Sequence, residues 1–253
     1  MARPLIVIPA RLGATRLPNK PLAEIAGEAM IVHVWRRAMA AEAGDVLVAT
    51  DAPEIMAAIE KAGGRAVMTR ADHQSGSDRV FEAAQIADPE GAADIVVNVQ
   101  GDQPLLEPSL IRDCIAPLTD LSVDIGTLAA VIAEPSDVLE PSFVKVVATP
   151  AGLPDIMRAL YFTRSPAPYG PGPLYHHIGI YAYRRAALAR FVALPPSPLE
   201  LREKLEQLRA LEAGMRIDVK RVDTVPMSVD TPADLERVRA LFAATANTPR
   251  LIA

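Results

Sequence analysis

Short apolar runs alternate with amphipathic segments over residues 5–99. The runs are too short for helices and nearly free of polar residues, as in strands that are buried on both faces of a parallel sheet. Strands are expected at 5–8, 45–50, 65–69 and 94–99, and helices at 30–39, 51–62 and 80–87. This alternation predicts βαβ units and an α/β fold with a Rossmann-like, mostly parallel sheet flanked by helices.

The second half of the chain has a different pattern. Strands are expected at 124–132, 144–148, 154–162 and 175–183, with no long helix between them and a proline-rich loop at 165–173. A helix should begin at the N-cap Ser197 and run through Leu211 to Gly214, followed by a strand at 216–222. We therefore expect one α/β domain over 1–253, with a main part at 1–120 and 215–245 and a small mixed-sheet lobe at 121–214.

Composition narrows the possible functions. A net charge of −5 and 4% aromatic residues argue against a nucleic-acid binder. The single cysteine, Cys114, excludes an intrachain disulfide or a cysteine-based zinc site and fits a reducing cytoplasm; we expect it to be buried. No signal-peptide pattern or run approaching 18 apolar residues is present, so we expect a cytoplasmic protein with no membrane insertion.

The loop after the first strand carries three cations, Arg11, Arg16 and Lys20. It should lie at the carboxyl end of the sheet, where ligands of open α/β sheets bind. Three cations there suit a polyanion such as a nucleoside triphosphate, although each alone could be an ordinary exposed side chain. The glycine fingerprints of dinucleotide and P-loop sites are absent.

The polar turn 72–79 leads into the third expected helix. Ser75 or Ser77 can cap that helix, and Arg79 follows one turn later. A helix N-terminus at this edge of the sheet is also a natural seat for groups of a nucleotide.

Two carboxylates are candidate Mg²⁺ ligands. Asp102 follows the fourth strand, where the alternative is a turn aspartate that binds its own backbone. Asp230 precedes the last helix, whose cap is already supplied by Thr231 and Asp234. Asp51, by contrast, is explained as an N-cap with Glu54. Two carboxylates and a basic loop fit a nucleotidyl-transfer site, which requires no protein nucleophile.

The chain also resembles a known family in six segments. These are 8–21 (IPAR…TRLP…KP), 69–76 (TRADHQSG), 98–102 (NVQGD), 177–181 (HIGIY), 205–209 (LEQLR) and 229–232 (VDTP). Together they are similar to the 3-deoxy-manno-octulosonate cytidylyltransferases, or CMP-Kdo synthetases. The similarity covers about Leu5 to Phe242.

The resemblance implies the nucleotide-diphospho-sugar transferase fold and a cytoplasmic homodimer. The implied reaction is Mg²⁺-dependent transfer of CMP from CTP to 3-deoxy-D-manno-octulosonate (Kdo), for lipopolysaccharide biosynthesis. It implies catalytic roles for Arg11, Lys20 and Asp102, and metal binding by Asp102 and Asp230. The implied nucleotide-binding residues are Pro9, Ala10, Arg11, Arg16, Lys20, Ser75, Arg79 and Gln100. The implied sugar-binding residues are Arg164, His177, Tyr183, Glu206 and Gln207.

Some positions depart from the family pattern. Gln103 replaces a frequent Glu and is not counted as a metal ligand, Ala182 replaces a frequent Gly, and His176 stands in place of a longer base. These departures concern the choice of sugar. Three alternatives therefore stay open: cytidylyl transfer to a sialic acid or an amino analogue of Kdo, a non-catalytic nucleotide-binding regulator, and an NAD-linked oxidoreductase, which the missing glycine fingerprint disfavours.

Overall fold

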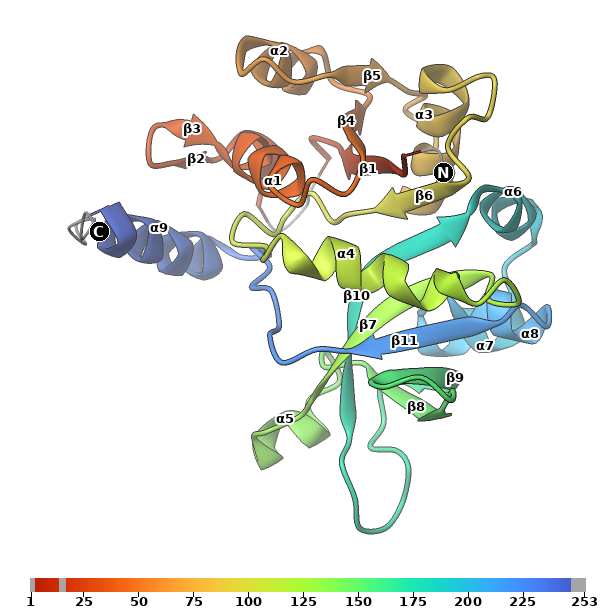
Figure 1. Cartoon of the computed structure of the whole chain (residues 1–253). Coiled ribbons are helices and arrows are strands. Elements are labelled where there is room, and N and C mark those ends of the chain that lie inside the picture. Colours follow the sequence, from red (N-terminus) through yellow and green to blue (C-terminus); the bar gives the residue numbers. More distant parts are fainter. Residues whose placement is uncertain (1–2, 14–16, 247–253) are drawn as a thin grey trace, which may run out of the picture.

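The computed structural model describes residues 3–13 and 17–246. Four parallel strands, in the order β5-β4-β1-β6, form one half of its large sheet (Figure 1). They are β1 (Leu5–Ala10), β4 (Asp45–Thr50), β5 (Ala66–Met68) and β6 (Ile95–Asn98). Helices α1 (Met30–Met39), α2 (Pro53–Lys61) and α3 (Gly76–Ala87) connect them. The predicted α/β class and the parallel βαβ units are confirmed.

Strand β1 shows why the apolar runs lack alternation. Ile6 and Ile8 pack into a core with α1, α2 and the helix α4 (Ser109–Ile115). Leu5 and Val7 face the opposite core, which includes α3 and the helix α6 (Arg185–Ala193). Because helices cover both faces of the sheet, every position of the strand must be apolar.

The predicted mixed strands continue the same sheet. They are β7 (Ile125–Val131), β8 (Lys145–Pro150), β9 (Ile156–Thr163), β10 (Tyr175–Arg184) and β11 (Ile217–Arg221). Strand β10 lies antiparallel between β6 and β7, and the order continues β7-β11-β9-β8. Within the described residues only β10 and β9 run against the other strands of this sheet. Strand β8 also pairs with β10, so the lobe curls on itself.

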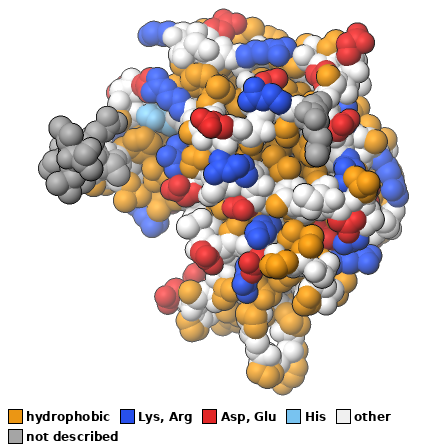
Figure 2. All heavy atoms as spheres, in the orientation of Figure 1, with side chains coloured by type: hydrophobic (Ala, Val, Ile, Leu, Met, Phe, Trp, Pro, Cys, Tyr) orange, Lys and Arg blue, Asp and Glu red, His pale blue; other side chains and the backbone are white. Residues whose placement is uncertain are grey.

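The remaining elements are short, except the last helix. They are β2 (Glu24–Ile25), β3 (Glu28–Ala29), the 3-10 turns η1 (Lys20–Leu22) and η2 (Ala116–Thr119), and the helices α5 (Pro135–Leu139), α7 (Pro198–Glu203), α8 (Leu208–Glu212) and α9 (Pro232–Ala246). The loop between β9 and β10 projects from the lobe, and its outer surface is largely apolar (Figures 1 and 2). Charged side chains of both signs are interspersed over the rest of the face in Figure 2.

Two predicted helix starts are confirmed. Ser197 caps α7 in a capping box with Glu200. The Thr231 hydroxyl accepts a hydrogen bond from the Asp234 N–H at 3.2 Å, at the start of α9. Both caps are made between residues three apart in the sequence.

Two predictions about helices are wrong. Asp51 does not cap α2: the N-cap is Ala52, and the Asp51 carboxylate binds Arg79. The single helix predicted from Ser197 to Leu211 is two helices, because Lys204 adopts the left-handed region at φ 58° and ends α7. The side chain of the neighbouring Glu203 binds Thr163 and the Arg164 N–H at the end of β9.

Cys114 is buried, as predicted, with its thiol directed at the carbonyls of Gly126 and Ile180. Burial raises its pKa, so the thiol stays protonated and is a poor nucleophile.

Within residues 3–13 and 17–246, no helix has both the length and the apolar character needed to cross a lipid bilayer.

Candidate active site

A pocket of about 170 Å³ lies at the carboxyl ends of β1 and β6, beside the N-terminus of α3. Its walls include six of the predicted nucleotide-binding residues: Pro9, Ala10, Arg11, Ser75, Arg79 and Gln100. Arg16 lies outside the described residues. A larger groove of about 770 Å³ elsewhere, lined by parts of α3 and α6, contains none of the predicted site residues. The fold therefore brings residues from three separate segments of the chain, 9–11, 73–79 and the end of β6, to one pocket, as expected for an α/β sheet.

The backbone approaches itself closely at this edge. A Cβ atom on Gly101 would lie 2.7 Å from the carbonyl oxygen of Pro9, too close for any other residue without movement. Gly101 thus lets the segment after β6 pass against the end of β1. Gln100, one residue earlier, donates from Nε2 to the carbonyl of Gly179 at 2.9 Å and so links the pocket to β10.

Ser75 is the N-cap of α3. Its hydroxyl accepts from the Asp78 N–H at 3.2 Å, and the Asp78 carboxylate accepts from the Ser75 N–H at 3.1 Å. Ser77, the other predicted cap, instead donates to Glu206 at 2.9 Å. The two serines of this turn therefore have different roles: Ser75 caps the helix, and Ser77 contacts a predicted sugar-binding residue.

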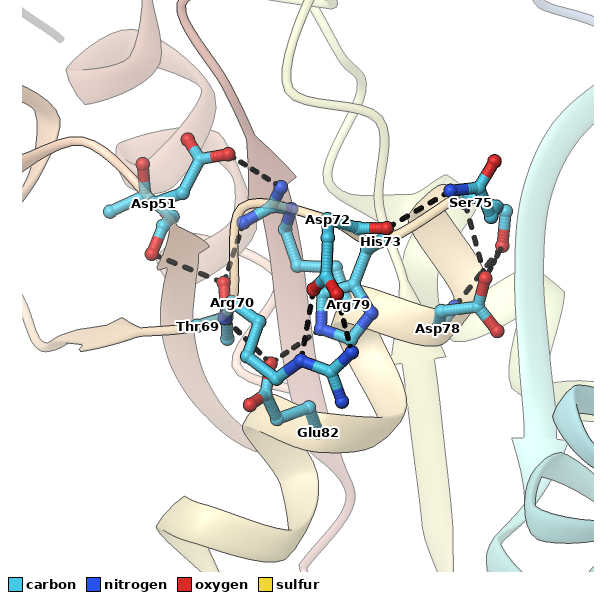
Figure 3. A network of polar contacts seen from close by, with 11 residues as sticks. Asp51, Thr69, Arg70, Asp72, His73, Ser75, Asp78, Arg79 and Glu82 are labelled. Atoms are coloured by element: carbon cyan, nitrogen blue, oxygen red, sulfur yellow. Dashed lines mark hydrogen bonds and ion pairs between the residues drawn. The ribbon is translucent and has the colours of Figure 1, made fainter.

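Arg79 is held by protein groups on the wall of the pocket (Figure 3). Its guanidinium donates to Thr69 Oγ1 at 2.6 Å and to Asp51 Oδ2 at 2.8 Å, and the residue is only 3% exposed. Arg79, which was predicted to bind the nucleotide, therefore also has a structural role that the sequence did not reveal. His73, also on the pocket wall, contacts Glu82 at 2.5 Å; its position in the same polar turn was the only sequence signal for it.

The Asp51–Arg79 pair should stabilise the fold. Asp51→Ala leaves a nearly buried guanidinium without its carboxylate, and we expect the free energy of unfolding to fall by ~3 kcal/mol, measured by urea denaturation. Asp72→Ala is the matched control, since Asp72 pairs with Arg70 on the surface with both side chains 68% exposed. That control should leave stability unchanged. Equal stability of the two variants would contradict the structural role of Asp51.

Lys20 joins the two predicted metal ligands. Its Nζ lies 2.8 Å from Asp102 Oδ2 and 3.2 Å from Asp230 Oδ1. The Val229 N–H donates to the Asp102 carbonyl at 2.9 Å, which holds the loop before α9 against the loop after β6. Burial opposes the charge on Lys20, but both carboxylates outweigh it and raise the pKa, so the ammonium persists at neutral pH.

These residues fit a divalent metal bound together with phosphates. Among residues 3–13 and 17–246, no cluster of three or more acidic, histidine or cysteine side chains could hold an ion by itself. A hard ion such as Mg²⁺ uses one or two carboxylates and takes other oxygens from substrate and water. Gln103, which was not counted as a ligand, is buried and donates from Nε2 to the Ser228 hydroxyl at 3.3 Å.

The predicted sugar-binding residues lie mainly on β10 and in the turn between α7 and α8. His177 Nε2 is 3.0 Å from Thr127 Oγ1, and burial, aided by His176, lowers its pKa to about 3, so it is neutral. Tyr183 is buried, with its ring stacked on Phe191. Burial raises the pKa of Glu206. Gln207 is 6% exposed, and its Nε2 has no hydrogen-bond partner among the described residues. An unpaired buried amide is costly, so a ligand oxygen there would be favourable.

Arg164 follows β9 and binds backbone carbonyls. Nε donates to Glu203 O at 2.8 Å and Nη1 to Pro141 O at 2.9 Å. This places Arg164 beside the turn that carries Glu206 and Gln207. Ser77 connects Glu206 to the N-terminal turn of α3, so the predicted sugar and nucleotide residues adjoin.

Comparison with known proteins decides the family. The family model described as Cytidylyltransferase matches residues 5–217. A 3-deoxy-manno-octulosonate cytidylyltransferase of Methylobacterium radiotolerans is 66% identical over 242 residues, covering 96% of this chain and 98% of its own. The chain belongs to the 3-deoxy-manno-octulosonate cytidylyltransferases.

Other relatives of this cytidylyltransferase agree. The corresponding protein of Azorhizobium caulinodans is 63% identical over 243 residues, covering 96% of this chain and 97% of its own. A solved CMP:2-keto-3-deoxy-manno-octonic acid synthetase complexed with CTP superposes with a TM-score of 0.89 at 42% identity, covering 96% of this chain and all of that one. A nucleotidyl transferase of Methanothermobacter thermautotroptrophicus, at 17% identity and a TM-score of 0.61, shares the fold. Cytidylyltransferases that use CTP typically need a divalent metal.

Proposed function

We propose that this cytidylyltransferase transfers CMP from CTP to the anomeric hydroxyl of Kdo and releases pyrophosphate. The observation that carries the proposal is the cluster of Asp102, Lys20 and Asp230 at the same edge of the sheet as the pocket with Arg11, Ser75 and Gln100 on its walls. A protein that merely bound nucleotide would not require two carboxylates held around one lysine. The same cluster has no use in hydride transfer, which also disfavours the oxidoreductase alternative.

The proposed residues act by placing and neutralising charge. The sugar hydroxyl attacks the α-phosphorus in line, a new P–O bond forms, and the bond to the bridging oxygen of pyrophosphate breaks. Arg11, Arg16 and Lys20 would stabilise the negative charge that develops on the leaving pyrophosphate. Mg²⁺ held by Asp102 and Asp230 would supply further charge neutralisation when bound. Pro9, Ala10, Ser75, Arg79 and Gln100 would hold the nucleotide.

The acid sugar would lie between β10 and the turn from α7 to α8. Its carboxylate would pair with Arg164, and its hydroxyl groups with His177, Tyr183, Glu206 and Gln207. Because His177 is neutral, it offers a hydrogen bond without a second positive charge. In this proposal residues 1–120 and 215–245 bind the nucleotide, and residues 121–214 bind the sugar and form a homodimer. The enzyme would act in the cytoplasm and supply activated Kdo for lipopolysaccharide.

Pyrophosphate release tests the proposal directly. We expect release when the protein is mixed with CTP, Mg²⁺ and Kdo, and none when the metal is removed with a chelator. A sialic acid and an amino analogue of Kdo serve as matched sugar controls. Release with one of these and not with Kdo would keep the chemistry and replace the sugar, whereas CTP binding without release for any acid sugar would favour the regulator.

A further inference from the structure

The turn between α7 and α8 is fastened to the end of β9 by the side chain of Glu203. Its Oε1 accepts hydrogen bonds from the Thr163 hydroxyl at 2.9 Å and from the Tyr161 hydroxyl at 3.4 Å. Its Oε2 accepts from the backbone N–H of Arg164 at 3.0 Å. One carboxylate thus binds three residues, Tyr161, Thr163 and Arg164, at the end of a strand that is about 40 residues away in the chain.

Arg164 makes the reciprocal contacts. Its Nε donates to the Glu203 carbonyl at 2.8 Å, and its Nη2 donates to the Lys204 carbonyl at 3.4 Å. Its own carbonyl accepts from the buried Lys145 ammonium at 3.3 Å. With the bond to Pro141, the guanidinium uses three of its five N–H groups, and the remaining two can meet a carboxylate. The head group is therefore fixed in place but still able to bind an anion.

The position of Glu203 is not explained by helix stability. Glu203 is the last residue of α7, and a negative charge is unfavourable at the C-terminal end of a helix. The next residue, Lys204, bends the chain at φ 58°, and Glu206 and Gln207 follow in the turn before α8. The contacts of Glu203 therefore set where this turn lies relative to Arg164.

We propose that Glu203 is a positioning residue that fixes the distance between Arg164 and the Glu206–Gln207 turn, and thereby the affinity for the acid sugar. This inference rests on the proposed function, since it takes these residues as the two sides of the sugar pocket. The Glu203 carboxylate is hydrogen-bonded to protein groups, and in this proposal it does not contact the substrate. Glu203 does not line the nucleotide pocket, so we expect CTP binding to change much less than sugar binding when Glu203 is replaced.

The test compares Glu203→Ala with Glu203→Gln. The alanine variant loses all three side-chain contacts, and we expect its KM for Kdo to rise about tenfold or more, because small displacements of binding groups are costly. Its dissociation constant for CTP, measured by calorimetry, should stay within about twofold. In the glutamine variant the amide oxygen can accept from the Arg164 N–H and the amide NH₂ can donate to Thr163, so sugar KM should return close to the starting value.

Controls separate positioning from general damage. Arg202→Ala, on the exposed side of α7, should change neither constant. In a protein that already carries Arg164→Ala, adding Glu203→Ala should raise sugar KM by less than about twofold, because the guanidinium whose distance from the turn matters is no longer present. If Glu203→Ala does not fold, Glu203 can be tested through Thr163→Val, which removes the Thr163–Glu203 hydrogen bond together with the one from the Ser165 N–H. We expect a smaller rise of sugar KM in the same direction.

Three outcomes would overturn the inference: an unchanged sugar KM in Glu203→Ala, equal losses of sugar and CTP binding, or a glutamine variant as impaired as the alanine one. Failure of the proposed function would look different. In that case the unaltered protein itself would release no pyrophosphate with CTP and Kdo.

Discussion

Asp102→Asn is expected to lower kcat by about a thousandfold or more, equivalent to ~4 kcal/mol of lost transition-state stabilisation. Asparagine keeps the size of the side chain but removes the charge that would hold Mg²⁺ and that pairs with Lys20 at 2.8 Å. The measurement is the steady-state rate of pyrophosphate release at saturating CTP and Kdo.

The fold should survive this change. Lys20 keeps Asp230 as a partner at 3.2 Å, and both Lys20 and Asp102 are partly exposed to solvent. We expect the free energy of unfolding to change by less than ~2 kcal/mol. Asp94→Asn is the matched control, because Asp94 is exposed just before the opposite end of β6. A near-normal rate in a well-folded Asp102→Asn protein would remove Asp102 from the metal site.

Arg164→Ala is expected to raise the KM for Kdo about 30-fold, corresponding to ~2 kcal/mol for a charge-assisted bond to the sugar carboxylate. The KM for CTP should change little, because the nucleotide pocket is built from β1, β6 and α3. The two KM values are measured by varying one substrate at saturation of the other.

Arg158→Ala controls for loss of a positive charge on the same strand, since Arg158 is an exposed residue of β9. It should leave both KM values unchanged. Equal increases in the two KM values of Arg164→Ala would place Arg164 outside the sugar pocket and assign it to holding the lobe together through its carbonyl contacts.

Much of the fold could be predicted because its signals are local. The apolar run of β1, the capping box at Ser197 and the Thr231 cap each depend on neighbours within a few residues. The same holds for the general place of the site, because parallel strands deliver their carboxyl ends to one edge. The loop cations and Asp102 could thus be expected near one another from sequence.

The two wrong helix predictions concern side chains that bind a partner far away in the sequence. Asp51 has the local pattern of an N-cap, but a buried guanidinium 28 residues away competes for its carboxylate. The segment after Ser197 has an uninterrupted helical pattern, but Glu203 binds the end of β9, 40 residues away, and the chain bends at Lys204. Neither partner is visible in a window of sequence, because only the packed sheet brings them within reach.

The sequence by itself determined the strands of the large sheet, the starts of α1, α3, α7 and α9, and the residue types of the site, because hydrophobic periodicity and capping are short-range effects. Only the tertiary structure decided how those residues are used. It joined Asp102 to Asp230 through Lys20, fixed Arg79 to Asp51, and held Arg164 against the turn after α7. These are charged contacts between segments far apart in the chain, and their strength depends on burial that only the folded protein provides.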